Sequence, residues 1–188
     1  MRLLIIGVVA ALTACGGSSS GTTTTISPET VDTVAFDPAD LVTYESIPLG
    51  FEIGHPPDWT VSEVMAENLI GFTAPGSDAG LTPNFNVTVT EVTSDLPPAA
   101  YYEGEIERVT TSLENAEILE VADVNIDGAI GRGLTVVTRQ ADMDIGIARI
   151  IVIKDERAYE LSFFARAGEL ERLSPMVTAI FRSLRWVS

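Results

Sequence analysis

Residues 123–128 carry the clearest pattern of side chains for metal chemistry. Asp123, Asn125 and Asp127 place side-chain oxygens at alternate positions before Gly128, as in the first half of a calcium-binding loop. The pattern then ends, because the twelfth position, where such a loop has a bidentate glutamate, is Leu134. An Asp-Gly pair between two apolar runs is also a preferred β-hairpin turn. We therefore favour a hairpin at this point over a calcium site, and expect no resident metal or cofactor.

Catalytic residues of the common nucleophilic mechanisms are scarce. His55 is the only histidine and Cys15 the only cysteine, so every Ser-His or Cys-His mechanism would depend on them. The chain contains no Gly-x-Ser-x-Gly, Walker or His-Glu-x-x-His motif. The 27 acidic residues leave one route open, which is hydrolysis by two carboxylates in a concave site. We expect no enzymatic activity, with a carboxylate-based hydrolase as the remaining catalytic alternative.

The single cysteine follows an N-terminal targeting pattern. Arg2 precedes an apolar run over 3–12, and small residues then lead to Cys15, which is the layout of a secretory signal peptide. The run is too short for a transmembrane helix, which needs about 20 apolar residues. Leu12-Thr13-Ala14-Cys15 resembles a bacterial lipobox, at which lipoprotein signal peptidase cuts before a diacylglyceryl-modified cysteine.

The lipobox resemblance implies a signal peptide over 1–14 and acyl chains, palmitate among them, on Cys15. Acyl chains contribute about 0.8 kcal/mol per buried CH₂, so two or three of them anchor a protein durably. The implied location is the extracytoplasmic face of a cell membrane. An ordinary secretory signal with an incidental cysteine is the alternative.

A low-complexity Gly/Ser/Thr stretch follows Cys15 and has nothing to bury. We assign 15–48 to the lipidated cysteine and a flexible tether, with a short helical turn at 38–41 as an alternative for its later part. Residues 49–188 then form one domain. The formal net charge of −16, from 11 basic and 27 acidic residues, excludes nonspecific binding to nucleic acid and to anionic lipid.

The domain alternates strand and helix patterns. Apolar–polar alternation and turn residues predict strands over 49–53, 59–64, 69–74, 85–92, 118–126, 129–138, 145–153 and 159–165. Tyr102, Ile106, Val109 and Leu113 have the spacing of one helix face. A terminal helical face contains Leu170, Leu173, Val177, Ile180, Phe181 and Leu184. For this helix we predict Ser174 as the N-cap and Pro175 as the first helical residue.

This order of elements predicts an α+β fold, an antiparallel β-sheet packed by helices. It resembles the PsbP-like α/β/α sandwich of extrinsic photosystem proteins, of small bacterial lipoproteins of the LpqN type and of a Ran-binding nuclear-import factor. The residues that carry the resemblance are Gly50-Phe51-Glu52-Ile53, Pro57-Asp58-Trp59, Tyr159-Glu160-Leu161 and Ile180-Phe181-Arg182-Ser183-Leu184. The resemblance implies that Trp59 and Trp186 belong to the core, and it assigns no functional residue.

Members of this fold mostly act as non-enzymatic adaptors or binding modules, which sets the functional expectation. We expect a membrane-anchored, extracytoplasmic lipoprotein of the cell envelope that docks on an envelope protein complex. A lipoprotein that binds a small apolar or lipid ligand between sheet and helix is the alternative. The residues that would bind either partner are not identified by the sequence.

Overall fold

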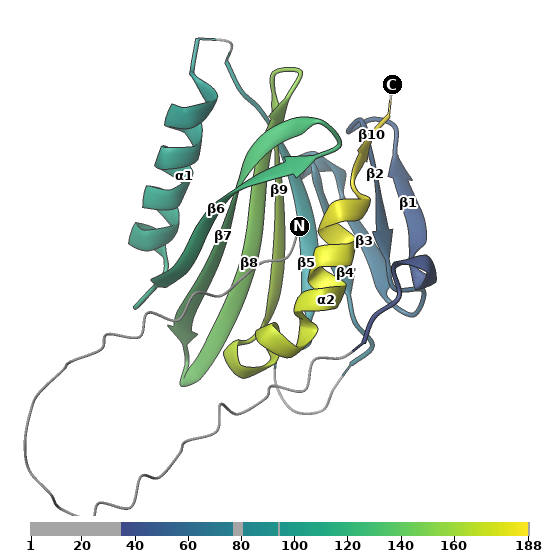
Figure 1. Cartoon of the computed structure of the whole chain (residues 1–188), viewed down its shortest axis with the longest axis vertical. Coiled ribbons are helices and arrows are strands. Elements are labelled where there is room, and N and C mark those ends of the chain that lie inside the picture. The colour runs from purple at the N-terminus through teal and green to yellow at the C-terminus, as the bar shows by residue number, and fades with distance from the viewer. Residues whose placement is uncertain (1–34, 77–80, 94, 188) are drawn as a thin grey trace, which may run out of the picture. The chain divides into compact units, whose positions relative to one another are not determined.

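The computed structural model describes residues 35–76, 81–93 and 95–187. They form two antiparallel sheets, two α-helices and two short 3-10 helices (Figure 1). The α+β fold predicted from the sequence is therefore confirmed. The predicted signal peptide, Cys15 and the first part of the predicted tether lie outside the described residues.

The larger sheet has seven strands in the order β3-β4-β5-β9-β8-β7-β6. Its strands are β3 (Thr60–Val64), β4 (Leu69–Thr73), β5 (Asn84–Glu91), β6 (Glu117–Ile126), β7 (Ala129–Gln140), β8 (Met143–Lys154) and β9 (Arg157–Arg166). Strands β6 to β9 form an antiparallel meander, as predicted. The β6–β7 turn is the predicted hairpin, since Asp127 and Gly128 both have positive φ, of 46° and 85°.

The smaller sheet has three strands in the order β1-β2-β10. These are β1 (Val42–Ser46), β2 (Phe51–His55) and β10 (Arg185–Trp186). Strands β1 and β10 are not among the predicted strands, and β1 lies within the range 15–48 that the sequence assigns to the tether. The alternative of a helical turn at 38–41 is confirmed by the 3-10 helix η1 (Pro38–Asp40), where the Asp37 carboxylate accepts a hydrogen bond from the Ala39 N–H at 2.9 Å. A second 3-10 helix, η2 (Met65–Glu67), links β3 to β4.

Helices α1 (Pro98–Ser112) and α2 (Ala167–Ser183) contribute to the apolar clusters on opposite faces of the larger sheet. Along β8, Ile150 and Val152 belong to the cluster of α2, whereas Ile147 and Ile151 belong to that of α1. We call these two surfaces the α2 face and the α1 face. Strand side chains alternate between the faces, so each strand serves both.

Most of the core lies on the α2 face, where the smaller sheet also packs. Phe72 and Phe85 stack at a centroid distance of 4.2 Å, and Phe163 is likewise fully buried. Trp59 is buried, as the PsbP-like resemblance implied. Trp186 only partly fulfils that expectation, because it packs against the core but stays half-buried.

The predicted start of the last helix is wrong. Helix α2 begins at Ala167, and Pro175 lies inside it. Proline at this point removes one helical hydrogen bond. The first two turns form nevertheless, because they bury Leu170, whose side chain lies against Gly146 of β8. No helix within the described residues is long and apolar enough to cross a bilayer.

Candidate functional site

A polar groove of about 450 Å³ lies on the α1 face, between α1 and strands β5, β8 and β9. We call it the α1 groove. It is lined by Asn86, Thr88, Thr90, Tyr101, Glu105, Arg108, Arg149, Glu160, Ser162 and Phe164. Successive side chains of a strand point to opposite faces of the sheet, so every second residue of these strands can line the groove. For example, Asn86 and Ser162 are register partners, whereas their neighbours Phe85 and Phe163 pair on the α2 face.

Helix α1 is fixed at both ends, so the wall of the groove has a defined position. The Tyr102 hydroxyl donates to the Ile130 carbonyl at 3.0 Å and accepts from the Ile153 N–H at 3.2 Å. Just beyond the other end, the Thr138 hydroxyl donates to the Glu114 carbonyl at 2.7 Å. Tyr102 and Val109 are buried against β7 and β8. Tyr101, Glu105 and Arg108 of the same helix line the groove.

Arg149 is the most unusual residue of the groove. Its side chain is only 14% exposed, and its Nε donates to the Ser162 hydroxyl at 2.8 Å. Its Nη1 is buried and has no hydrogen-bond acceptor among the described residues, although a Glu160 oxygen lies 3.7 Å away. Burial lowers the pKa of Arg149, and the charge of Glu160 only partly offsets this effect.

Glu160 is the counterpart of Arg149 and is 13% exposed. Its carboxylate accepts hydrogen bonds from the Tyr101 hydroxyl and from Arg108 Nη2, each at 3.3 Å. Burial raises the pKa of Glu160, as does the charge of Glu105, against the opposing charges of Arg149 and Arg108. Arg108 also bonds to Glu105, so that one guanidinium connects two carboxylates.

The contacts of Glu160, at 3.3 Å from Tyr101 and Arg108 and 3.7 Å from Arg149, are long for a charged group, whose hydrogen bonds are usually about 2.7–2.9 Å. The pKa values of Arg149 and Glu160 both move toward the neutral form, so their mutual attraction does not compensate their burial. A ligand that accepts from Arg149 and donates to Glu160 would supply the missing hydrogen bonds. The groove is lined by two guanidinium groups and two carboxylates, so that their formal charges cancel. This neutrality favours an uncharged, hydrogen-bonding ligand over an ion.

The three residues of the calcium-loop pattern have hydrogen-bond or ion-pair partners within the protein. Asp123 pairs with Arg132, the Asn125 side chain accepts from the Gly128 N–H at 3.1 Å, and Asp127 accepts from the Trp186 N–H at 3.3 Å. The three oxygens proposed for a calcium loop thus already have protein partners. Within residues 35–76, 81–93 and 95–187, no group of three or more His, Cys, Asp or Glu side chains is placed to hold a metal ion.

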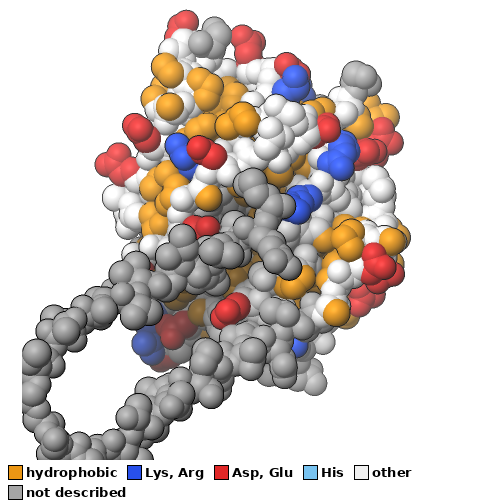
Figure 2. Space-filling model, viewed as in Figure 1, with side chains coloured by type: hydrophobic (Ala, Val, Ile, Leu, Met, Phe, Trp, Pro, Cys, Tyr) orange, Lys and Arg blue, Asp and Glu red, His pale blue; other side chains and the backbone are white. Residues whose placement is uncertain are grey.

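His55, the histidine that a nucleophilic mechanism would need, lies at the end of β2. Its ring is buried, its Nδ1 lies 2.8 Å from the Pro56 carbonyl, and it packs 5.1 Å from the ring of Phe72. The alternative of a small apolar or lipid ligand between sheet and helix stays a prediction. On the α2 face, Phe51, Phe163 and Ile180 are packed with no exposed surface. The acidic side chains visible in Figure 2 are spread over the surface rather than gathered into one patch.

Sequence reasoning missed the α1 groove. One signal was present, because Arg149 occupies a position that alternates with Ile145, Ile147 and Ile151 on one face of an apolar strand. A charged residue at such a position is buried only with partners. Its partner Glu160 lies on the next strand of the β8–β9 hairpin. Arg108, which also bonds to Glu160, comes from a helix far away in sequence, and no local pattern connects it to them.

The sequence matches no protein-family model and no curated protein. The structure, however, is similar to cyanobacterial PsbP from Synechocystis sp. PCC 6803, with a TM-score of 0.60 and 13% identity over 79% of this chain and 93% of that one. The chain has a PsbP-like fold.

Two further structures share this PsbP-like fold. LpqN of Mycobacterium tuberculosis, described as involved in cell envelope biogenesis, has a TM-score of 0.63 and 15% identity over 79% of this chain and 91% of its own. Protein PA94 of Pseudomonas aeruginosa, a putative regulator of unknown function, has a TM-score of 0.58 and 15% identity over 76% and 94% of the two chains. At these identities the similarity establishes the fold alone.

Proposed function

We propose that this chain is a lipid-anchored, non-enzymatic binding module of the cell envelope that recognises its partner through the α1 groove. The observation that carries the proposal is the buried guanidinium of Arg149, whose Nη1 has no hydrogen-bond acceptor among the described residues and lies 3.7 Å from a Glu160 oxygen. A buried charged group without full hydrogen bonding destabilises a fold by about 1–3 kcal/mol or more. An arrangement with this cost is better explained by recognition than by stability.

The groove favours an uncharged segment of a partner protein that offers both donors and acceptors, such as backbone or side-chain amides. Asn86, Thr88 and Thr90 add neutral hydrogen-bonding groups along β5. The location rests on the lipobox at Cys15, and the fold shared with LpqN, a protein of envelope biogenesis, supports it. Attachment through Cys15 would keep the domain near other envelope proteins.

A hydrolase is the second candidate, because the groove is concave and contains two carboxylates. Glu160, with its raised pKa, would act as the general acid, and Glu105 would act as the base or nucleophile. Arg108 bonds to both carboxylates. Its positive charge opposes the rise in the pKa of Glu160 on which an acid role would depend, and for that reason we prefer a binding role.

Crosslinking of the full anchored protein in its own cells, followed by mass spectrometry, tests the proposal. We expect a reproducible envelope protein partner that is lost in Cys15→Ser and reduced in Arg149→Met. Turnover of an envelope polymer by the wild type that is abolished in Glu160→Gln would instead identify the hydrolase. A partner captured equally by wild type and Arg149→Met would remove the groove from the proposal.

A further inference from the structure

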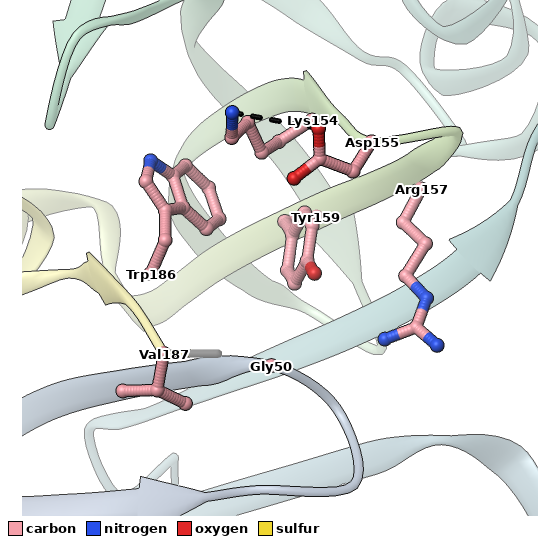
Figure 3. A pocket seen from close by; sticks show the side chains of 7 residues that line it. All are labelled: Gly50, Lys154, Asp155, Arg157, Tyr159, Trp186 and Val187. Atoms are coloured by element: carbon pink, nitrogen blue, oxygen red, sulfur yellow. Dashed lines mark ion pairs between the residues drawn. The ribbon is translucent and has the colours of Figure 1, made fainter.

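A second pocket, of about 280 Å³, lies near the β8–β9 turn and is separate from the α1 groove. We call it the turn pocket. It is lined by Gly50, Lys154, Asp155, Arg157, Tyr159, Trp186 and Val187. Figure 3 shows the Tyr159 ring with Trp186 and Lys154 to one side and Arg157 to the other. Two cationic side chains therefore border one small pocket.

The carboxylate of Asp155, which also lines the turn pocket, does not neutralise both of its cations. Lys154 pairs with its neighbour Asp155 at 3.4 Å, but that carboxylate is 80% exposed. Arg157 has no carboxylate within 4.0 Å among the described residues, although Glu91 is its register partner on β5. Acidic residues outnumber basic ones 27 to 11 in this chain. A half-buried arginine that lines a pocket without an acidic partner is therefore notable.

The backbone at Gly50 also favours a ligand in the turn pocket. Gly50, with φ of 77°, brings the backbone close, and a Cβ there would lie 3.3 Å from the Tyr159 hydroxyl and 3.6 Å from Arg157 Nη1. The pocket thus combines hydrogen-bond donors, two cations and an apolar wall of Trp186 against Tyr159, whose rings lie 4.8 Å apart.

We infer that the turn pocket binds a small oxyanion group, a carboxylate or a phosphate, with Arg157 as the main contact and Lys154 as a second. Guanidinium groups bind both anions through paired hydrogen bonds. This site is independent of the proposed function, because none of its residues lines the α1 groove.

Tryptophan fluorescence of the full chain tests the inference, since the protein has only two tryptophans. In a Trp59→Phe background the signal reports Trp186 alone. We would titrate acetate and inorganic phosphate separately, at ionic strength held constant with chloride. We expect a saturable change with at least one of the two anions, and the preferred anion would identify the ligand class.

Arg157→Gln should weaken that binding at least tenfold. Arg166→Gln is the matched control, because Arg166 is on the same strand, is exposed and does not line the turn pocket. Lys154→Gln, at the end of β8, serves as a second test if Arg157→Gln is unstable, and it should also weaken binding. A response that does not saturate, or that is equal in the two arginine variants and in Lys154→Gln, would overturn the inference.

Discussion

The two faces of the seven-stranded sheet are built from the same strands but differ in what they do. On the α2 face, Phe85 of β5 pairs with Phe163 of β9, and both are fully buried. One position along, on the α1 face, Asn86 pairs with Ser162. Two positions further Thr88 pairs with Glu160, whose hydrogen bonds from Tyr101 and Arg108 are long, at 3.3 Å each. A shift of one residue thus separates the apolar core from the polar groove.

This difference indicates where stability and recognition lie. Burial of large apolar side chains on the α2 face supplies most of the favourable free energy of folding. The charged cluster on the α1 face adds little, because burial shifts the pKa values of both Arg149 and Glu160 toward their neutral forms. The following predictions test this separation.

The largest effect is expected for Phe163→Ala. This change removes a fully buried ring from the α2 face and should lower the free energy of unfolding by about 3–5 kcal/mol. Thr90→Ala, an exposed residue of the α1 groove, should change it by less than about 0.5 kcal/mol. Urea unfolding of both variants measures the difference. Equal effects would contradict the assignment of stability to the α2 face.

Arg149→Met should have an intermediate effect, a loss of about 1–3 kcal/mol, because Glu160 is left buried beside one fewer cation. The double variant Arg149→Met, Glu160→Gln should recover part of this loss, since the unpaired charge is also removed. A double-mutant cycle by urea unfolding gives the coupling free energy. Simple additivity would show that the two residues are not an energetic pair.

The pH dependence of stability should reveal Glu160. Its folded pKa is raised, so its contribution is fully present below the unfolded pKa, about 4.3, and is lost as pH rises through the folded value. Lowering the pH from 7 toward 4.5 should therefore stabilise the wild type relative to Glu160→Gln. Unfolding curves across this range measure the change. The opposite slope would mean that the folded protein favours the ionised carboxylate.

The smallest effect is expected at the β6–β7 turn. Asp127→Asn keeps a side chain that tolerates the positive φ of 46°, and it should change the free energy of unfolding by less than about 0.5 kcal/mol. Millimolar calcium should not alter the thermal midpoint of either form. A rise in midpoint that occurs only in the wild type would restore the calcium site at Asp123, Asn125 and Asp127.

Much of the fold could be predicted from local sequence. Alternation at Phe85, Val87 and Val89 predicted β5, and the spacing from Tyr102 to Val109 predicted the apolar side of α1. Strand β10 could not be found this way, because Arg185 and Trp186 become a strand only by pairing with Glu52 and Phe51. The start of α2 was misplaced because the local preference of Ser174-Pro175 was outweighed by the burial of Leu170.

The candidate site could not be predicted in the same way. The α1 groove depends on Arg108 of α1 meeting Glu160 of β9, a contact that only the topology creates. Glu160 did occur in the fragment Tyr159-Glu160-Leu161 that carried the PsbP-like resemblance, but there it marked a strand. The calcium pattern, in contrast, was visible locally and also had a local explanation as a turn.

Site-specific photo-crosslinking tests the central claim, that the α1 groove is the recognition surface, most directly. A photoreactive residue would replace Thr90 in the groove of the full anchored protein, and the matched control would replace Thr178, an exposed threonine of α2. We expect a specific envelope protein adduct from position 90 that is absent from position 178 and is lost on adding Arg149→Met. An adduct from position 178 alone, or one from position 90 that persists in Arg149→Met, would contradict it.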